Sequence, residues 1–263
     1  MTEQPSKTAF ITGATEGIGL EFARLLANKG YNLILVARNE SKLKSIADEF
    51  SSLGIKTKFY AKDLSLLSNA ENIYNDLKTN NVSVEILINN AGFGIDDAFL
   101  NIDWQKELQM YNLNMLTLAY FTKAFARDMV ARGYGRILNV ASIAAFQPGP
   151  YMAGYSATKA FVLSLSEAVN HELKGTNVSV SALCPGVTDS LFHQVAQSEQ
   201  TGMSKFMAHA TPKEVAEYGI QLMMKGKPSG IYGLSNRLMI FTNRFVSRKI
   251  STFLSGKMLK KQA

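Results

Sequence analysis

The sequence has little of what marks secreted, metal-binding or membrane-spanning proteins. Its 263 residues include one cysteine, Cys184, so no disulfide can form within the chain, which favours a reducing compartment. We interpret Cys184 as a small buried hydrophobic residue. The three histidines show no metal-ligand spacing, so we predict no metal site. The longest uncharged stretch, residues 137–158, is interrupted by two prolines and two glycines, and we therefore expect no membrane span.

Acidic residues are missing from the last part of the chain. Nine of the 28 Lys and Arg residues follow Glu217, and none of the 21 Asp and Glu residues does. The first 217 residues therefore carry 19 basic and 21 acidic side chains, which argues against a nucleic-acid-binding core. Residues 1–7 are polar and run directly into an apolar segment, so they do not resemble a signal peptide. We expect a soluble, cytoplasmic protein.

What the sequence does contain is an alternation of short apolar runs with helical patterns. The runs are mostly apolar throughout, as in parallel strands that are covered on both faces of a sheet. This alternation predicts an α/β fold: a single doubly wound parallel sheet, of Rossmann type, with helices on both faces. We predict strands at residues 8–12, 31–37, 56–60, 86–89, 135–140 and 178–183, and helices at 18–29, 41–53, 67–80, 104–131 and 155–173.

The predicted catalytic domain covers residues 1–235 and includes a candidate substrate lid. Residues 187–211 lack a clear strand but carry apolar side chains, including Phe192 and Phe206. A long irregular segment with apolar residues is usually functional rather than disordered, so we expect it to cover the substrate.

A basic amphipathic tail follows at residues 236–263. On a helix, Arg237, Arg244 and Arg248 would share one face beside an apolar one. Two interpretations stay open: the tail packs on its own subunit or a partner, or it attaches peripherally to an anionic membrane surface.

Tyr155 and Lys159 are the most informative pair of polar residues. Four residues apart on a predicted helix, they share one face. An unperturbed tyrosine has a pKa near 10, and one positive charge about 4 Å away supplies the roughly 4 kcal/mol that lowers this pKa by about three units. The pair is therefore predicted to exchange protons near pH 7. The spacing alone is weak evidence, because Tyr74 and Lys78 repeat it; we interpret Tyr74 as an ordinary helix residue and as a control.

A glycine-rich loop joins the first predicted strand to the first helix, with the sequence Thr12-Gly13-Ala14-Thr15-Glu16-Gly17-Ile18-Gly19. Glycines there let the backbone turn tightly and approach a pyrophosphate at the helix N-terminus. An ordinary glycine-rich turn is the alternative, but the place of the loop at the first strand–helix junction favours dinucleotide binding. No Lys followed by Ser or Thr stands in this loop, which argues against a nucleotide triphosphatase.

The end of the second predicted strand indicates which dinucleotide binds. Arg38 follows Ala37, and the strand offers no acidic residue to accept from a ribose 2′-hydroxyl, so NADP is favoured. The alternative for Arg38 is a solvated charge that precedes the helix, and Glu16 argues mildly against a phosphate pocket. Asp63, after the third strand, is a candidate acceptor for the adenine amine or a helix cap with Ser65.

With these positions in place, the chain resembles the short-chain dehydrogenase/reductases over residues 7 to about 235. The motifs occur in the family's order and at its intervals: Thr12-Gly13-x-x-x-Gly17-x-Gly19, Asn89-Asn90-Ala91-Gly92, Asn114, Ser142, Tyr155-x-x-x-Lys159 and Pro185-Gly186. The segment Gln147-Pro148-Gly149-Pro150-Tyr151 is similar to a subgroup of ketone reductases.

The resemblance implies an NADP-dependent oxidoreductase that moves a hydride between nicotinamide and a ketone, aldehyde or secondary alcohol. By resemblance, Tyr155 is the general acid/base, Lys159 lowers its pKa and binds the nicotinamide ribose, and Ser142 polarises the carbonyl. Asn114, with Asn112 as its competitor, would hold a water that links Lys159 to solvent. Asn90 belongs to the cofactor-binding motif, and Ser190 or its neighbour Thr188 would touch the carboxamide.

Other functions and partners stay open from the sequence. A non-catalytic NADP-sensing regulator, or an epimerase or dehydratase with the same Tyr–Lys pair, is the alternative. Five side chains either line an apolar pocket for a lipophilic substrate or belong to the core: Phe93, Phe146, Met152, Phe192 and Phe206. The predicted helices at 104–131 and 155–173 are apolar around much of their circumference, so with the family likeness we expect a homodimer or homotetramer.

Overall fold

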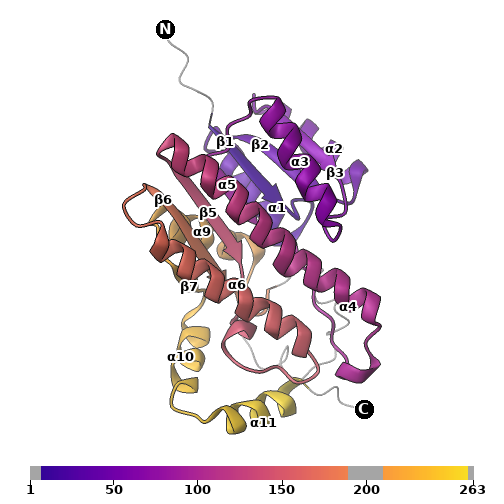
Figure 1. The fold of residues 1–263 in the computed structure, drawn as a ribbon, viewed down its shortest axis with the longest axis vertical. Coiled ribbons are helices and arrows are strands. Elements are labelled where there is room, and N and C mark those ends of the chain that lie inside the picture. Colours follow the sequence, from indigo (N-terminus) through magenta and orange to yellow (C-terminus); the bar gives the residue numbers. More distant parts are fainter. Residues whose placement is uncertain (1–6, 189–209, 260–263) are drawn as a thin grey trace.

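Parallel strands form one twisted sheet at the centre of the protein (Figure 1). This computed structural model describes residues 7–188 and 210–259. Seven strands of the described part pair in the order β3-β2-β1-β4-β5-β6-β7. Their bounds are β1 Thr8–Thr12, β2 Asn32–Ala37, β3 Thr57–Ala61, β4 Ile86–Asn89, β5 Gly135–Val140, β6 Val178–Cys184 and β7 Ser229–Ile231. The predicted doubly wound parallel sheet is confirmed.

Helices cover both faces of the sheet, which explains why the strands are apolar on both sides. In β1, Ala9 and Ile11 pack toward α1, α2 and α9, whereas Phe10 packs on Phe121 and Phe125 of α5. Figure 1 shows α3, α5 and α6 in front of the sheet. The helix bounds are α1 Gly17–Ala27, α2 Glu40–Ser51, α3 Leu67–Thr79, α4 Trp104–Tyr111, α5 Leu118–Arg132, α6 Ala153–Glu172, α9 Pro212–Met224, α10 Leu234–Asn243 and α11 Arg248–Leu259.

Two elements differ from the sequence prediction. The long helix predicted at 104–131 is interrupted between α4 and α5 by a π-helical segment, Asn112–Thr117. Its helical hydrogen bonding widens by one residue there, a change that leaves the apolar periodicity nearly intact and occurs often at functional sites. The strand β7 was not predicted, because its three residues, Ser-Gly-Ile, carry too little apolar pattern to stand out.

The C-terminal residues form two helices, and the single-helix face considered for the tail is wrong. Helix α10 ends at Asn243 and α11 begins at Arg248, so Arg237 and Arg248 lie on different helices with Arg244 in the turn. Figure 1 places both helices at the end of the molecule opposite the N-terminus. No helix among the described residues is long and apolar enough to cross a membrane.

Candidate active site

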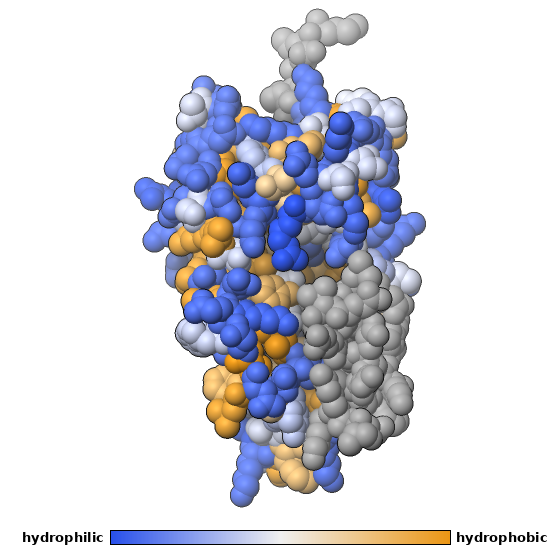
Figure 2. Space-filling view, turned by 90° about the vertical axis from the view of Figure 1, so that its right-hand side faces the viewer, coloured by the Kyte–Doolittle hydropathy of each residue, from blue (hydrophilic) through white to orange (hydrophobic). Residues whose placement is uncertain are grey.

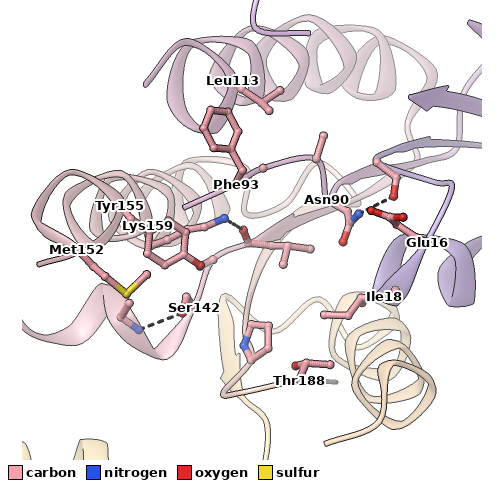
Figure 3. Close-up of a pocket in the computed structure, with 18 of the residues that line it drawn as sticks. Glu16, Ile18, Asn90, Phe93, Leu113, Ser142, Met152, Tyr155, Lys159 and Thr188 are labelled. Carbon is pink, nitrogen blue, oxygen red and sulfur yellow. Dashed lines mark hydrogen bonds between the residues drawn. The ribbon is translucent and has the colours of Figure 1, made fainter. Parts of the chain in front are cut away.

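A cavity of about 820 Å³ opens at the carboxyl ends of the strands (Figure 3). The strand order reverses direction between β1 and β4, and ligands of open α/β sheets bind at such a switch point. Loops after six strands line the cavity: 13–18 after β1, 38–39 after β2, 62–65 after β3, 90–93 after β4, 141–149 after β5 and 185–188 after β6. The topology therefore gathers motifs that are far apart in the sequence.

The glycine loop is fixed to the end of β4 by one side chain. The Asn90 amide Nδ2 donates to the carbonyl oxygens of Thr12 and Gly13, each at 3.1 Å. Gly13 has a positive φ of 66°, and a Cβ at Gly19 would lie 2.0 Å from the Gly13 oxygen. Only glycine fits at Gly19, which packs against the loop rather than lining the cavity.

The cavity wall contains most of the predicted cofactor residues. Gly13, Thr15, Gly17 and Ile18 line it on the side of the glycine loop. Because these residues precede and open α1, their backbone N–H groups lie at the positive end of a helix dipole, where a pyrophosphate binds.

Basic side chains gather where β2 and β3 end. Arg38, Lys42 and Lys62 line the cavity there. Glu16, the acidic neighbour, forms an ion pair with Lys42 at 3.2 Å, so its charge is compensated. Arg38 is exposed, and no ion pair with it occurs among the described residues. This end of the cavity therefore suits an anionic group.

Asp63 makes the capping contact considered for it and also lies at the cavity, and its contact with adenine stays a prediction. Its Oδ1 accepts a hydrogen bond from the Ser65 backbone N–H at 2.9 Å, which is the local capping contact. Asp63 also lines the cavity, beside Lys62. Its carboxylate is thus held in place at the cavity edge.

Ser142, Tyr155 and Lys159 meet at the inner end of the cavity (Figure 3). Ser142 follows β5, and its Oγ accepts from the Ala144 N–H at 3.1 Å, which orients the hydroxyl. Tyr155 and Lys159 lie on the first turns of α6 and are 8% and 5% exposed. The Lys159 Nζ donates to the Val140 carbonyl oxygen at 2.8 Å and lies 5.7 Å from the centroid of the Tyr155 ring.

Burial dominates the titration of this pair. Desolvation raises the pKa of Tyr155 to about 12, opposed in part by a hydrogen bond with Ser142. Desolvation likewise lowers the pKa of Lys159 to about 8, because a buried ammonium loses its hydration. The predicted lowering of the tyrosine pKa is therefore wrong for the chain by itself. The prediction treated the pair as solvated at about 4 Å and left out the free energy of desolvation.

Asn114 is held by a backbone segment and by α6. Its Nδ2 donates to the Phe93 oxygen at 2.9 Å and to the Thr158 Oγ1 at 3.1 Å, and its Oδ1 accepts from the Phe93 N–H at 3.2 Å. Asn114 is 1% exposed, whereas the alternative Asn112 is partly exposed. A Cβ at Gly92 would lie 2.9 Å from the Asn114 Oδ1, so glycine there leaves room for the amide. The π-helical segment thus ties α4 and α5 to the site.

Comparison with known proteins decides the family. A family model described as short chain dehydrogenase matches residues 7–201. The chain belongs to the short-chain dehydrogenase/reductase family. It is an oxidoreductase of this family.

Three relatives show the range of the resemblance. The ketoacyl reductase HetN of Nostoc sp. is 31% identical over 218 residues, which cover 82% of this chain and 75% of that protein. A very-long-chain 3-oxoacyl-CoA reductase of Phaeosphaeria nodorum is 40% identical over 66% of this chain. The chain described here spans about half of that reductase, since the aligned part covers 53% of its length. A solved short-chain dehydrogenase of Sphingobium yanoikuyae in complex with NADPH has a TM-score of 0.81 at 27% identity, covering 91% of this chain and 93% of that one.

The cavity wall next to Tyr155 in this short-chain dehydrogenase is largely apolar. Phe93 and Met152 line it as considered from the sequence, together with Leu113. Phe146 does not; it packs on a core cluster with Val162. Ser190, Phe192 and Phe206, and most of the predicted lid at 187–211, lie outside the described residues.

Thr188, the alternative to Ser190, lines the cavity after β6. Its Oγ1 donates to the Gly186 oxygen at 3.3 Å. The hydroxyl is therefore placed beside the Pro185–Gly186 turn.

The lining residues that sequence reasoning missed include a group of four from the C-terminal helices: Met239, Ser255, Met258 and Leu259. Leu259 packs in one cluster with Tyr155 and Met152. The i, i+4, i+8 spacing of Ser251, Ser255 and Leu259 was a usable signal, because it marks one helix face. Hydrophobicity, the usual mark of an inward helix position, does not identify Ser251 and Ser255.

Proposed function

We propose that this short-chain dehydrogenase uses NADP(H) to interconvert a ketone or aldehyde with the corresponding alcohol. The observation that carries the proposal is the buried Ser142–Tyr155–Lys159 cluster at the inner end of a cavity whose other end is basic. A dinucleotide has the same two-ended chemistry, with a reactive ring at one end and phosphate at the other. The loop, the basic residues and the cluster together fit such a molecule.

The residues divide the reaction among them. When bound, the dinucleotide would supply or accept a hydride. The Tyr155 phenol would donate the proton to the carbonyl oxygen in reduction and take it back in oxidation. Ser142, oriented by the Ala144 N–H, would hold the reacting oxygen beside the phenol. Hydride and proton together add across the C=O bond, and no further reactant is needed.

Lys159 and Asn114 have supporting roles in this proposal. Lys159 would hold the nicotinamide ribose, and its buried ammonium would stabilise negative charge on Tyr155 once the phenol has given up its proton. Asn114 contacts Thr158, the residue before Lys159, and would fix α6 against the loop after β4. Its role as a water ligand stays a prediction from the family resemblance.

NADP is proposed over NAD because of the charge around the end of β2. Arg38, Lys42 and Lys62 surround a region in which Glu16 is already paired. An Arg forms charge-assisted contacts with a 2′-phosphate that an unphosphorylated ribose cannot make. The solved relative in complex with NADPH supports this choice.

Cofactor titration tests the proposal. We expect tighter binding of NADPH than of NADH, and we expect Arg38→Ala to reduce this preference at least about tenfold by weakening NADPH binding. Lys44→Ala is the matched control, since Lys44 is an exposed α2 residue outside the cavity. Equal affinity of the wild type for both dinucleotides would contradict the NADP assignment.

A lipophilic substrate is proposed from the apolar wall of the cavity next to Tyr155. Phe93, Met152, Met258 and Leu259 present apolar surface there. We expect a panel of ketones and alcohols, followed by nicotinamide absorbance, to favour bulky apolar substrates over sugars. Binding of NADPH without turnover of any carbonyl or alcohol would favour the non-catalytic regulator instead.

A homo-oligomer is proposed from apolar side chains left exposed on α6 and beside α5. Leu116 and Phe161 are 50% and 38% exposed, whereas Leu118, Phe121 and Leu163 of the same region are buried. The exposed pair accounts for part of the apolar surface that led to the sequence prediction. Light scattering at micromolar concentration should give a multiple of 28.9 kDa, and a monomer there would reject the proposal.

A further inference from the structure

Helix α11 has its polarity reversed relative to an ordinary surface helix. The buried positions are Ser251, Ser255 and Leu259, so two of the three inward residues are serines. Three large apolar side chains of the helix, Ile250, Phe253 and Leu254, face outward and are between 50% and 61% exposed. A helix that docks only on its own domain would bury its apolar residues.

Hydrogen bonds from the C-terminal helices, together with the packing of Leu259 beside Tyr155, attach α11 to the domain. The Ser255 Oγ donates to the Pro148 oxygen at 2.8 Å, and the Asn243 Nδ2 donates to the Gln147 Oε1 at 3.1 Å. The same Gln147 oxygen accepts from Ser251 at 3.4 Å. Gln147 and Pro148 belong to the loop that leads into α6 and Tyr155. These contacts hold the helix in an orientation that presents its apolar side to the outside.

Helix α10 and the following turn extend the same surface. Leu234, Leu238, Phe241 and Phe245 are exposed, Phe245 by 77%, and the rings of Phe241 and Phe245 contact each other at 5.4 Å. Eight of the 17 large apolar side chains that are exposed in the described structure lie within residues 234–258. Figure 2 shows apolar and polar surface side by side at the lower end of the molecule, where Figure 1 places α11. We call residues 234–258 the C-terminal face.

Positive charge is interspersed with these apolar side chains. Arg244, Arg248, Lys249 and Lys257 are exposed on the C-terminal face, and the Lys257 Nζ lies 4.9 Å from the centroid of the Phe253 ring. The sequence has no acidic residue after Glu217. Aromatic and apolar side chains mixed with Lys and Arg are the composition of segments that lie in the membrane interface.

The other side of the C-terminal face lines the active-site cavity. Met239 of α10 and Ser255, Met258 and Leu259 of α11 line it. The two helices therefore separate the cavity from whatever covers their outer side.

We propose that the C-terminal face docks on the surface of an anionic lipid bilayer, with Phe245 and Phe253 inserted at the headgroup level and the basic residues on the lipid phosphates. The absence of a spanning helix in the described structure agrees with a protein that lies on the surface. Docking would put one wall of the cavity against the lipid, where apolar substrates concentrate. The docking itself does not depend on the proposed reaction.

Charge argues against a second copy of the chain on this face. A two-fold symmetric dimer sets the same patch against itself. Here that would oppose Arg248 and Lys249 to their own copies, with no acidic side chain on the face to pair with them. An anionic bilayer surface can pair with the basic side chains of the face and can also accept its apolar side chains.

Sedimentation of the full-length protein with vesicles tests the proposal. The probes are phosphatidylcholine vesicles with and without phosphatidylglycerol, at low and high salt. We expect binding only to the anionic vesicles, weakened by salt because exposed charges are screened within about 10 Å at 0.1 M ionic strength. Arg248→Glu with Lys249→Glu should lower the partition coefficient about tenfold or more, since each basic residue near an anionic surface changes it roughly fivefold.

Matched variants separate docking from folding. Phe245→Ser with Phe253→Ser should lower vesicle binding by a similar factor while turnover of a water-soluble substrate is kept. Leu53→Ser with Leu66→Ser is the apolar control, and Lys29→Glu with Lys44→Glu is the charge control; both change exposed residues outside the C-terminal face.

Three outcomes overturn the proposal. The first is a wild-type protein that does not sediment with anionic vesicles. The second is a control pair that loses binding as much as the test pair does. The third is an oligomer that becomes monomeric in the Phe245/Phe253 variant without any binding to vesicles, which would assign the face to a second copy.

Discussion

The chain carries the Tyr-x-x-x-Lys pattern twice, on α3 and on α6. On α3, the Tyr74 hydroxyl donates to the Asp128 Oδ2 at 3.0 Å and the Lys78 Nζ lies 2.9 Å from the Oδ1 of the same carboxylate. On α6, Tyr155 has a hydroxyl partner, Ser142, and Lys159 donates to a backbone carbonyl. One pair thus shares an anion at the surface, whereas the other is buried beside a serine hydroxyl and a backbone carbonyl.

The pKa values by themselves do not separate the two tyrosines. Burial raises the pKa of Tyr155 to about 12, and burial together with the Asp128 hydrogen bond raises that of Tyr74 to about 12 as well. What differs is the position of each pair. Tyr155 and Lys159 line the large cavity, and Tyr74 and Lys78 do not. A perturbed pKa therefore indicates function here only when it is combined with access to a cavity.

Removing the two phenol hydroxyls is the strongest test of this difference. Tyr155→Phe keeps the ring and removes the proposed proton donor, so turnover should fall about a hundredfold to ten-thousandfold while NADPH binding is largely kept. Tyr74→Phe should leave turnover nearly unchanged. Steady-state rates with NADPH would show this, and equal losses in the two variants would remove the catalytic assignment of Tyr155.

Replacing Lys159 should lower turnover but raise the free energy of unfolding, whereas replacing Lys78 should not have this combined effect. Lys159→Met should lower turnover strongly and weaken NADPH binding. It should also raise the free energy of unfolding at pH 7 by up to roughly 3 kcal/mol, because burial lowers the pKa of Lys159 from 10.5 to about 8 and this penalty on the ammonium disappears.

The pH dependence fixes the sign of that stability difference. Below pH 8 the native protein carries the buried ammonium and its full penalty. Between about pH 8 and 10.5 the native Lys159 has lost its proton and the unfolded one has not, so wild-type stability gains on the variant as pH rises. Denaturant unfolding from pH 7 to 10 measures this. Lys78→Met, at a half-exposed surface pair, is the matched control, and an identical trend in both variants would contradict the burial argument.

The smallest effect is expected from neutralising Asp128, the carboxylate that Tyr74 and Lys78 share. Asp128→Asn should destabilise the protein by about 1 kcal/mol, because it weakens one charge-assisted hydrogen bond and removes a surface ion pair. It should also lower the pKa of Tyr74, since the Asp128 hydrogen bond and charge both raise it. Spectroscopic titration of tyrosine in this variant, against Tyr74→Phe, would detect the change, whereas turnover should stay at the wild-type level.

The sequence was sufficient for the sheet and for most of the cavity wall. The six predicted strands lie within one residue of β1 to β6, because buried parallel strands are short, apolar runs between strong turn signals. The glycine loop was found from its place at the first strand–helix junction, and Ser142 from its place in the family's order of motifs. The spacing of motifs along the chain is enough to identify these residues.

The remaining parts depend on three-dimensional contacts that no local pattern encodes. The pKa of Tyr155 could not be predicted because desolvation depends on what covers the residue, and Leu259, far along the chain, packs beside it. The contribution of α11 to the cavity wall was missed because two of its three buried residues are serines, which bind the Gln147–Pro148 loop. Tyr74 was read as an ordinary helix residue, and only the fold brings Asp128 to it.

The bonds from Asn90 to Thr12 and Gly13 also have a thermodynamic consequence. They hold the glycine loop through the protein's own contacts, so the loop needs no bound phosphate to adopt its shape. A ligand that enters a preformed loop loses little affinity to ordering the backbone. We therefore expect dinucleotide binding measured by calorimetry to lack the large unfavourable entropy of a loop that folds on binding. Asn90→Ala should introduce that entropy, and association should slow because the loop would then have to find its conformation in each encounter.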